Sequence, residues 1–309
     1  MGQWIQKASM PTPRHDLQAI TVGNQIYAIS GGGDLTSDVV EIYDVQTDTW
    51  SQGPPIPTKR GWFGAVLLDQ KIYTIAGKTI RSEEEKARTG DPANYDIRDS
   101  VEVLDLTTQT WASLKPIAAP RAGLAATLCK GKIYAIGGNA MNNEIRTGGP
   151  HLDTVEIYDP QRDNWAVGIP IPTPLQGPAV ATIDDRIYVT AGIGGPERKP
   201  NSGTYVFDPD VGKWEQLAPI PTPRCDPGSL VVDRKIYTFG GWGNGGYYDN
   251  VEIYDIDTDR WTSDAPLPEK KAWMATALVQ KRIFVMGGAY RLADDSGYKW
   301  IDDMHELVT

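Results

Sequence analysis

The chain has 309 residues, including 32 glycines and 23 prolines, and a formal net charge of −10. This acidic balance, with no strip of lysine and arginine, disfavours a nucleic-acid partner. No apolar run reaches the roughly 18 residues of a membrane helix, so we expect no membrane partner either.

In chain order, the first predicted element is a strand at residues 4–9, and a unit of four short strands then recurs six times. The predicted units cover residues 14–52, 60–113, 121–167, 175–216, 224–263 and 271–309. Each contains a β-branched and aromatic run that ends at glycine, as in residues 235–241, which is typical of a buried strand followed by a turn. The last unit stops after three strands, and the strand at residues 4–9 resembles the missing fourth.

A tryptophan precedes the final glycine of the next strand run by 27 residues in every unit. The six pairs are Trp4 with Gly31, Trp50 with Gly77, Trp111 with Gly138, Trp165 with Gly192, Trp214 with Gly241 and Trp261 with Gly288. The distance between successive tryptophans varies, so insertions fall only between the glycine and the next tryptophan. Four short strands in a repeat of this period are typical of a propeller blade.

These features together resemble kelch repeats over essentially the whole chain: the strand run ending in glycine, the tryptophan, a Pro-x-Pro-Arg corner, and Val-Glu-Ile-Tyr-Asp at residues 155–159 and 251–255. The resemblance implies an all-β fold, a single domain over residues 1–309 that forms a six-bladed β-propeller with four antiparallel strands per blade. We expect the strand at residues 4–9 to complete the last blade and close the ring. The fold alone does not give the function, because propellers of one repeat type host unrelated activities.

All length variation is expected on one face of the ring. If strands a to d run antiparallel from the axis outward, the d–a corners and the b–c connections must share one end. We call this end the insertion face, because it carries the Pro-x-Pro-Arg corners and every variable insertion.

Six residues, each two past a corner, should line the channel where it opens on the insertion face: Asp16, Trp62, Gly123, Gly177, Asp226 and Trp273. Two carboxyl groups and two indoles at one opening predict a ligand site, because indoles stack on flat or sugar-like groups and carboxylates hold polar ones. The alternative is that the aspartates cap turns and the indoles fill space between blades.

The insertions of blades five and six are rich in aromatic residues. Blade five offers Trp242, Asn244, Tyr247 and Tyr248, and blade six offers Tyr290, Arg291 and Trp300. Since these blades are neighbours, the aromatic residues are predicted to form one recognition patch together with the arginine. The alternative is that the aromatic side chains fold down and seal the blades.

An arginine recurs at the corner of four units, as Arg14, Arg60, Arg121 and Arg224. Its recurrence favours a structural role in which each arginine bonds corner carbonyls. The alternative is that one or two of them point inward and bind an anionic ligand.

His15 lies next to Asp16 and is the candidate proton carrier, with Asp16 and Asp226 as the other candidate catalytic groups. The three histidines are not spaced for a metal ion, so we expect no metal and no cofactor. The two cysteines, Cys129 and Cys225, fall at different positions of their units, which argues against a disulfide and for a reducing, cytoplasmic setting. A secreted domain whose signal has been removed is the alternative.

Two functions stay open at this point. The kelch resemblance implies a binding protein, expected to be a monomer, that recognises a protein, peptide or small-molecule ligand at the channel mouth. The alternative is a carbohydrate-acting isomerase like the bacterial kelch sialate mutarotases or epimerases, or another lyase or isomerase with its site at the same mouth. It would use His15, Asp16 or Asp226 as acid and base on a sugar stacked against Trp62 or Trp273, although no residue motif of such an enzyme is matched here.

Overall fold

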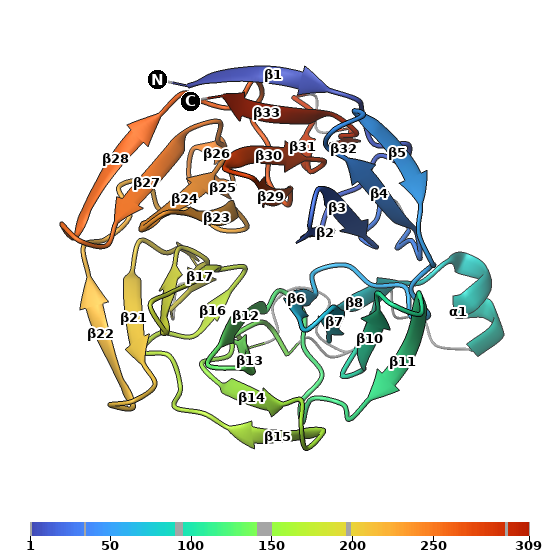
Figure 1. Cartoon of the computed structure of the whole chain (residues 1–309), viewed down its shortest axis with the longest axis horizontal. Coiled ribbons are helices and arrows are strands. Elements are labelled where there is room, and N and C mark those ends of the chain that lie inside the picture. The colour runs from blue at the N-terminus through green and yellow to red at the C-terminus, as the bar shows by residue number, and fades with distance from the viewer. Residues whose placement is uncertain are drawn as a thin grey trace.

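The computed structural model describes residues 2–33, 35–89, 95–140, 150–195, 199–293 and 296–308. Its main strands form six four-stranded antiparallel sheets arranged as a ring around an open centre (Figure 1). The predicted six-bladed β-propeller is therefore confirmed. Most of the blade-three insertion, residues 139–153, lies outside the described residues.

The strands of a blade are named here from the axis outward. The innermost strands are β2 (Gln18–Val22), β6 (Gly64–Leu68), β12 (Ala125–Cys129), β17 (Ala179–Ile183), β23 (Gly228–Val232) and β29 (Ala275–Val279). The second strands are β3 (Gln25–Ile29), β7 (Lys71–Ile75), β13 (Lys132–Ile136), β18 (Arg186–Thr190), β24 (Lys235–Phe239) and β30 (Arg282–Met286). The third strands are β4 (Val40–Asp44), β10 (Val101–Asp105), β14 (Val155–Asp159), β21 (Thr204–Asp208), β27 (Val251–Asp255) and β33 (Met304–Val308). The outermost strands are β5 (Thr49–Gln52), β11 (Thr110–Leu114), β15 (Asn164–Val167), β22 (Lys213–Leu217), β28 (Arg260–Asp264) and β1 (Gln3–Lys7).

The hydrophobic core lies between neighbouring blades. One cluster joins Tyr134 and Ile136 of blade three to Ile187 and Phe207 of blade four. The second strand of a blade has a neighbouring blade on each of its faces, so its side chains are buried on both sides. This explains why the repeated strand run is continuously apolar and does not alternate.

The ring closes through the N-terminal strand, as predicted. Strand β1 pairs with β33 in antiparallel register from Gln3 opposite Val308 to Lys7 opposite Met304. Figure 1 shows the two ends of the chain side by side, with β1 on the outside of the last blade. The pairing covers the edge that β33 would otherwise expose.

The invariant tryptophan and glycine each tie one blade to the next. The Trp50 indole donates to the Ala8 carbonyl of the preceding linker at 2.8 Å, and Trp111 donates likewise to Pro54 at 3.0 Å. The Gly31 amide donates in the other direction, to the Arg60 carbonyl at the next corner. A Cβ at Gly31 would lie 2.6 Å from the His15 carbonyl oxygen, so a larger residue does not fit there.

The insertions carry short extra strands and the only helix among the described residues. The extra strands are β8 (Lys78–Ile80) with β9 (Tyr95–Ile97), β16 (Leu175–Gln176) with β19 (Ile193–Gly194) and β20 (Lys199–Pro200), β25 (Trp242–Gly243) with β26 (Gly246–Tyr247), and β31 (Ala289–Arg291) with β32 (Tyr298–Trp300). Helix α1 (Glu83–Thr89) projects from the rim in Figure 1. Isolated bridges join corners to insertions, as in His15 with Gly32 and Cys225 with Trp242, which places both kinds of connection at one end of the ring.

Candidate functional site at the mouth of the channel

Six residues, one from each blade, surround the channel at the insertion face, and their backbones form a closed ring of hydrogen bonds. They are Asp16, Trp62, Gly123, Gly177, Asp226 and Trp273. Each donates its N–H to the carbonyl of its counterpart in the preceding blade, at 2.8 to 3.2 Å. All six have left-handed backbone angles, with φ between 50° and 65°. The fold, and not the side chain, therefore sets this unusual conformation.

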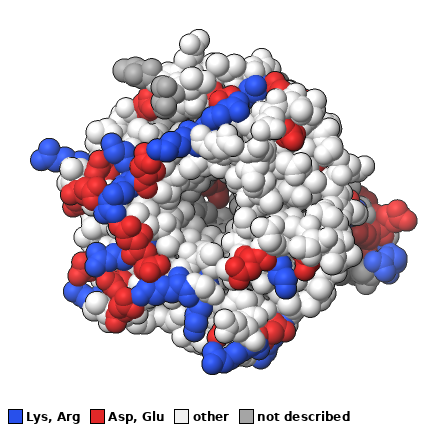
Figure 2. Space-filling model, in the orientation of Figure 1, with Lys and Arg blue, Asp and Glu red and all other residues white. Residues whose placement is uncertain are grey.

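These six residues line a cavity of about 100 Å³, which we call the mouth. Below it the channel widens to about 250 Å³ between the inner strands, where small residues such as Gly64 and Ala125 face the axis. A Cβ at Gly64 would lie 2.6 Å from the Cβ of Ala126, so the small residues there serve packing. Figure 2 shows a hollow at the centre of the ring.

Asp16 is held at the mouth by two basic groups. Its side chain is almost fully buried, and Oδ2 lies 3.1 Å from His15 Nδ1 and 3.8 Å from Lys78 Nζ. The Lys78 ammonium sits 3.6 Å from the centre of the Trp62 ring. Burial lowers the pKa of Lys78, and the charges of Asp16 and Asp226 oppose that shift. The other oxygen of Asp16, Oδ1, is buried and has no hydrogen-bond partner among the described residues.

Asp226 has a different environment from Asp16. Its Oδ2 accepts a hydrogen bond from Trp242 Nε1 at 3.0 Å. Burial raises its pKa to about 7, and the nearby charge of Asp16 adds to the shift. The indole N–H groups of Trp242 and Trp273 and the charge of Lys78 act in the opposite direction. Near neutral pH this carboxyl group is therefore able both to donate and to accept a proton.

The two predicted indoles both line the mouth. Trp62 Nε1 is buried and has no hydrogen-bond partner in the described part of the chain, so a group that accepts from it would satisfy an unpaired donor. The Trp273 ring lies edge-on to Tyr247, with 5.7 Å between ring centres. His15 stacks on Trp300 with 4.6 Å between ring centres, and it supports Asp16 from behind without lining the cavity.

Glycines form the opposite side of the mouth, because neighbouring side chains occupy the space that a Cβ atom would need there. A Cβ at Gly177 would overlap the Asp226 carboxyl group. A Cβ at Gly123 would lie 2.7 Å from Gln176 Cγ. The acidic and indole groups therefore face a side of the cavity on which no side chain of the ring projects.

The predicted patch of blades five and six is brought together only in part. Trp242 lies behind Asp226, whereas Tyr247, Tyr290 and Arg291 line a separate groove on the surface. Sequence reasoning overlooked Tyr298, which stacks on Trp300 with 5.5 Å between ring centres. It also overlooked Lys78, whose place at the mouth follows from its bridge to Gly61 at the corner.

The four corner arginines do not face the mouth. Their side chains are almost fully buried in the blades, and each forms an ion pair with the glutamate of the third strand. The pairs are Arg14 with Glu41, Arg60 with Glu102, Arg121 with Glu156 and Arg224 with Glu252. Arg14 also donates to the Ser30 carbonyl at 2.7 Å. The structural role predicted for them fits this placement, and the ligand-binding role does not, because their donors are used inside the blade.

Cys225 directly precedes the mouth residue Asp226 but is itself fully buried. Burial raises the pKa of its thiol well above the usual value. Among the described residues, no group of three or more His, Cys, Asp or Glu side chains could hold a metal ion. The one helix in the described ranges is too short to cross a membrane.

Comparison with protein families gives two matches along this chain. The model of the KLHDC2/KLHL20/DRC7 Kelch-repeats domain matches residues 123–309, and the model of the Kelch motif matches residues 13–57. Kelch-like protein 25 of Xenopus tropicalis is 27% identical over 192 residues, which cover 61% of this chain and 30% of the relative. Human Kelch-like protein 15 is 26% identical over 194 residues, covering 62% of this chain and 32% of the relative. The alignments thus span about a third of the length of these relatives.

Among solved structures, that described as "Structure of YjhT" superposes with a TM-score of 0.77, covering 96% of this chain and 95% of that one. The two sequences are 17% identical, so the likeness concerns the fold alone. The first of the family models covers more than half of the chain. By its repeats, its ring of blades and these matches, the chain belongs to the kelch-repeat family.

Proposed function

We propose that this protein binds a small hydroxylated molecule, such as a sugar unit, at the mouth of the channel. The supporting observation is that three buried atoms of mouth residues have no hydrogen-bond partner among the described residues: Asp16 Oδ1, Trp62 Nε1 and Trp273 Nε1. The carboxyl oxygen is an acceptor and the two indole N–H groups are donors, and a hydroxyl group both donates and accepts. A molecule with several hydroxyl groups therefore matches the mouth better than an anion, which the two carboxyl groups would repel.

The size of the mouth limits how much of such a molecule enters it. A cavity of about 100 Å³ admits one hydroxylated edge of a sugar, and the rings of Trp62 and Trp273 provide apolar surface for the carbon skeleton beside it. The protein or peptide partner expected from the family stays a prediction. To use the same cavity, a peptide would have to place a hydroxylated side chain in it.

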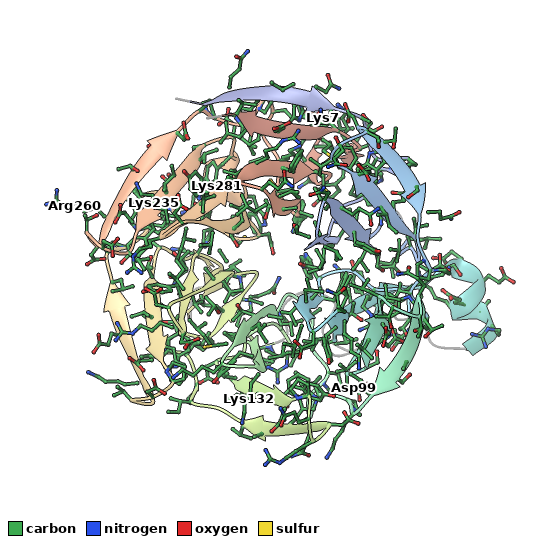
Figure 3. All side chains as sticks on the ribbon, in the orientation of Figure 1. Lys7, Asp99, Lys132, Lys235, Arg260 and Lys281 are labelled. Atoms are coloured by element: carbon green, nitrogen blue, oxygen red, sulfur yellow. The ribbon has the colours of Figure 1, made fainter. Side chains whose placement is uncertain are left out.

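Binding is tested by titration calorimetry and ligand-observed NMR with D-glucose, D-galactose, D-mannose and N-acetyl-D-glucosamine. We expect at least one of these sugars to bind, and Asp16→Asn and Trp62→Phe to weaken it by ten-fold or more because each removes one partner. Asp99→Asn is the matched control, since Asp99 is exposed and lies near the outer rim in Figure 3. Binding of none of the sugars, or equal binding by the mouth variants, would overturn the proposal.

A second function, acid–base isomerisation of the bound sugar, is favoured by the pKa of Asp226, about 7. A carboxyl group that is half protonated near neutral pH is suited to move a proton between ring oxygen and hydroxyl. Exchange NMR between the two anomers of the sugar that binds tests this function. Acceleration that is lost in Asp226→Asn while binding persists would support it, and an unchanged exchange rate in the presence of protein would remove it.

A further inference from the structure

A second concave surface lies beside the mouth, at the junction of blades five and six. We call it the Tyr247 groove, and it is lined by Gly245, Tyr247, Glu269, Lys270, Tyr290 and Arg291. Its volume is about 380 Å³, nearly four times that of the mouth. Two phenol rings and a mixture of charges in an open groove are suited to a polar ligand that lies along the surface.

Tyr247 connects the groove to the mouth. Its ring lines the groove and also contacts Trp273, which lines the mouth. Its strand neighbour across the β25–β26 hairpin is Trp242, the residue that donates to Asp226. Tyr298 lies edge-on to Trp273, with 5.9 Å between the ring centres, and 44% of its surface is exposed. An unbroken band of aromatic rings thus leads from the mouth to the groove.

The groove has more basic side chains than the mouth, where Lys78 is the one lysine or arginine that the structure describes beside Asp16 and Asp226. Lys270 and Arg291 line it, and Lys299 lies beside it with Nζ 5.5 Å from the centre of the Tyr290 ring. Glu269 is the one acidic residue among the lining groups. Burial raises the pKa of Glu269, and Asp303 adds to the shift. The groove therefore favours a negatively charged group, whereas the mouth disfavours one.

We propose that the Tyr247 groove is a second subsite, and that the ligand is a chain of at least two hydroxylated units whose outer unit carries an anionic group. The inner unit occupies the mouth, the aromatic band supports the chain, and Lys270 and Arg291 bind the carboxylate or phosphate. This inference rests on the proposed function, because it extends the same site outward.

The test compares the monosaccharides above with the disaccharides cellobiose, lactose and mannobiose. Each disaccharide is used in three forms: neutral, oxidised to a carboxylate at C6 of the outer unit, or phosphorylated at that position. We expect an acidic disaccharide to bind at least ten-fold more tightly than its neutral form, and this gain to shrink in high salt. In a Lys270→Gln/Arg291→Gln variant the gain should disappear, while binding of the neutral monosaccharide stays unchanged. Comparison of the carboxylate with the phosphate identifies which anion the groove prefers.

Arg260→Gln/Lys281→Gln is the matched control, because it removes the same charges at two exposed positions, the start of β28 and the β29–β30 turn, that do not line the groove. Monosaccharide binding with no gain from the acidic outer unit, or a gain that survives the Lys270→Gln/Arg291→Gln variant, would overturn the second subsite and leave the proposed function standing. Failure of all compounds to bind the unmodified protein would overturn the proposed function itself.

Discussion

In the mouth, burial changes the proton affinity of Asp226. It holds its proton up to about pH 7 in the folded chain, whereas an unfolded aspartate releases its proton near pH 3.9. Between these two values the unfolded state loses the proton and the folded state keeps it. The stability contributed by this group therefore falls as the pH rises through this window, and it is constant above it.

We expect Asp226→Asn to remove this dependence, since an amide of the same shape does not ionise. The unfolding free energy of the unmodified protein, relative to the variant, should fall between pH 4 and pH 7 by at most ~1.4 kcal/mol per pH unit, the limit for a single proton. Urea denaturation of both proteins at several pH values measures this difference. A difference that is flat with pH, or that grows in favour of the unmodified protein, would contradict the assigned protonation.

At the same scale, sequence reasoning located Asp16 and Asp226, whose position recurs in every repeat, and missed Lys78 and Tyr298, whose positions do not recur. Asp16 and Asp226 were found by counting from the corner, because antiparallel strands fix where that position lies. Lys78 and Tyr298 sit in insertions of unequal length, so no repeat indicates which way their side chains point. The raised pKa of Asp226 depends on burial beneath such insertions, and the sequence alone does not contain that information.

At the scale of elements, the buried arginine–glutamate pairs stabilise single blades. In blade two, Arg60 Nη2 lies 2.8 Å from Glu102 Oε2, and Arg60 Nη1 donates to the carbonyls of Ala76 and Ser100. The arginine thus links the corner, the second strand and the start of the third strand. Removing one member leaves the other charge buried without its partner.

We expect Arg60→Gln to lower the unfolding free energy by about 3 kcal/mol or more. The double variant Arg60→Met/Glu102→Leu should recover much of that loss, because no charge is then left buried. Arg186→Gln, which breaks the solvent-exposed pair with Asp208, should cost less than about 1 kcal/mol. Chemical denaturation checks all three variants, and an equal cost for Arg60→Gln and Arg186→Gln would refute a special role for the buried pair.

Helix α1 begins with a run of three glutamates, a composition that is also typical of a solvated loop and so does not by itself predict a helix. A capping box begins it: the Glu85 amide donates to Ser82 Oγ at 3.1 Å, and the Ser82 amide donates to Glu85 Oε2 at 2.8 Å. The Ser-x-x-Glu signal was present in the sequence. Three glutamates in its first turn also favour a helix start at this point.

At the scale of the whole molecule, ring closure depends on five residues of β1. Trp4 of this strand packs edge-on against Phe239 of blade five and donates to the Ala265 carbonyl at 3.2 Å. The repeat period, the constant tryptophan–glycine spacing and the incomplete last unit were sufficient to predict this arrangement. The insertions were predicted only as lengths, because each has its own sequence and folds against the neighbours it meets.

Deletion of residues 2–9 should open the ring. We expect a loss of ~2 kcal/mol or more from the missing tryptophan packing alone, together with association of the truncated chains through the uncovered edge of β33. Denaturation midpoints and light scattering after size-exclusion chromatography measure the two effects. Trp4→Ala serves as the control, since it should be destabilised without associating, and a truncated chain that matches the intact one in both measurements would argue against closure by β1.

The ring of six left-handed residues around the axis allows different side chains to be presented from the same backbone. Every amide and carbonyl in that circle is already satisfied by its neighbour, so the rosette is held together without help from any side chain. Aspartate, tryptophan and glycine all occupy it with nearly the same backbone angles. The ring therefore acts as a fixed frame: its aspartate and tryptophan side chains can be exchanged without loss of its backbone bonds, whereas Gln176 and Asp226 fill the space beside Gly123 and Gly177.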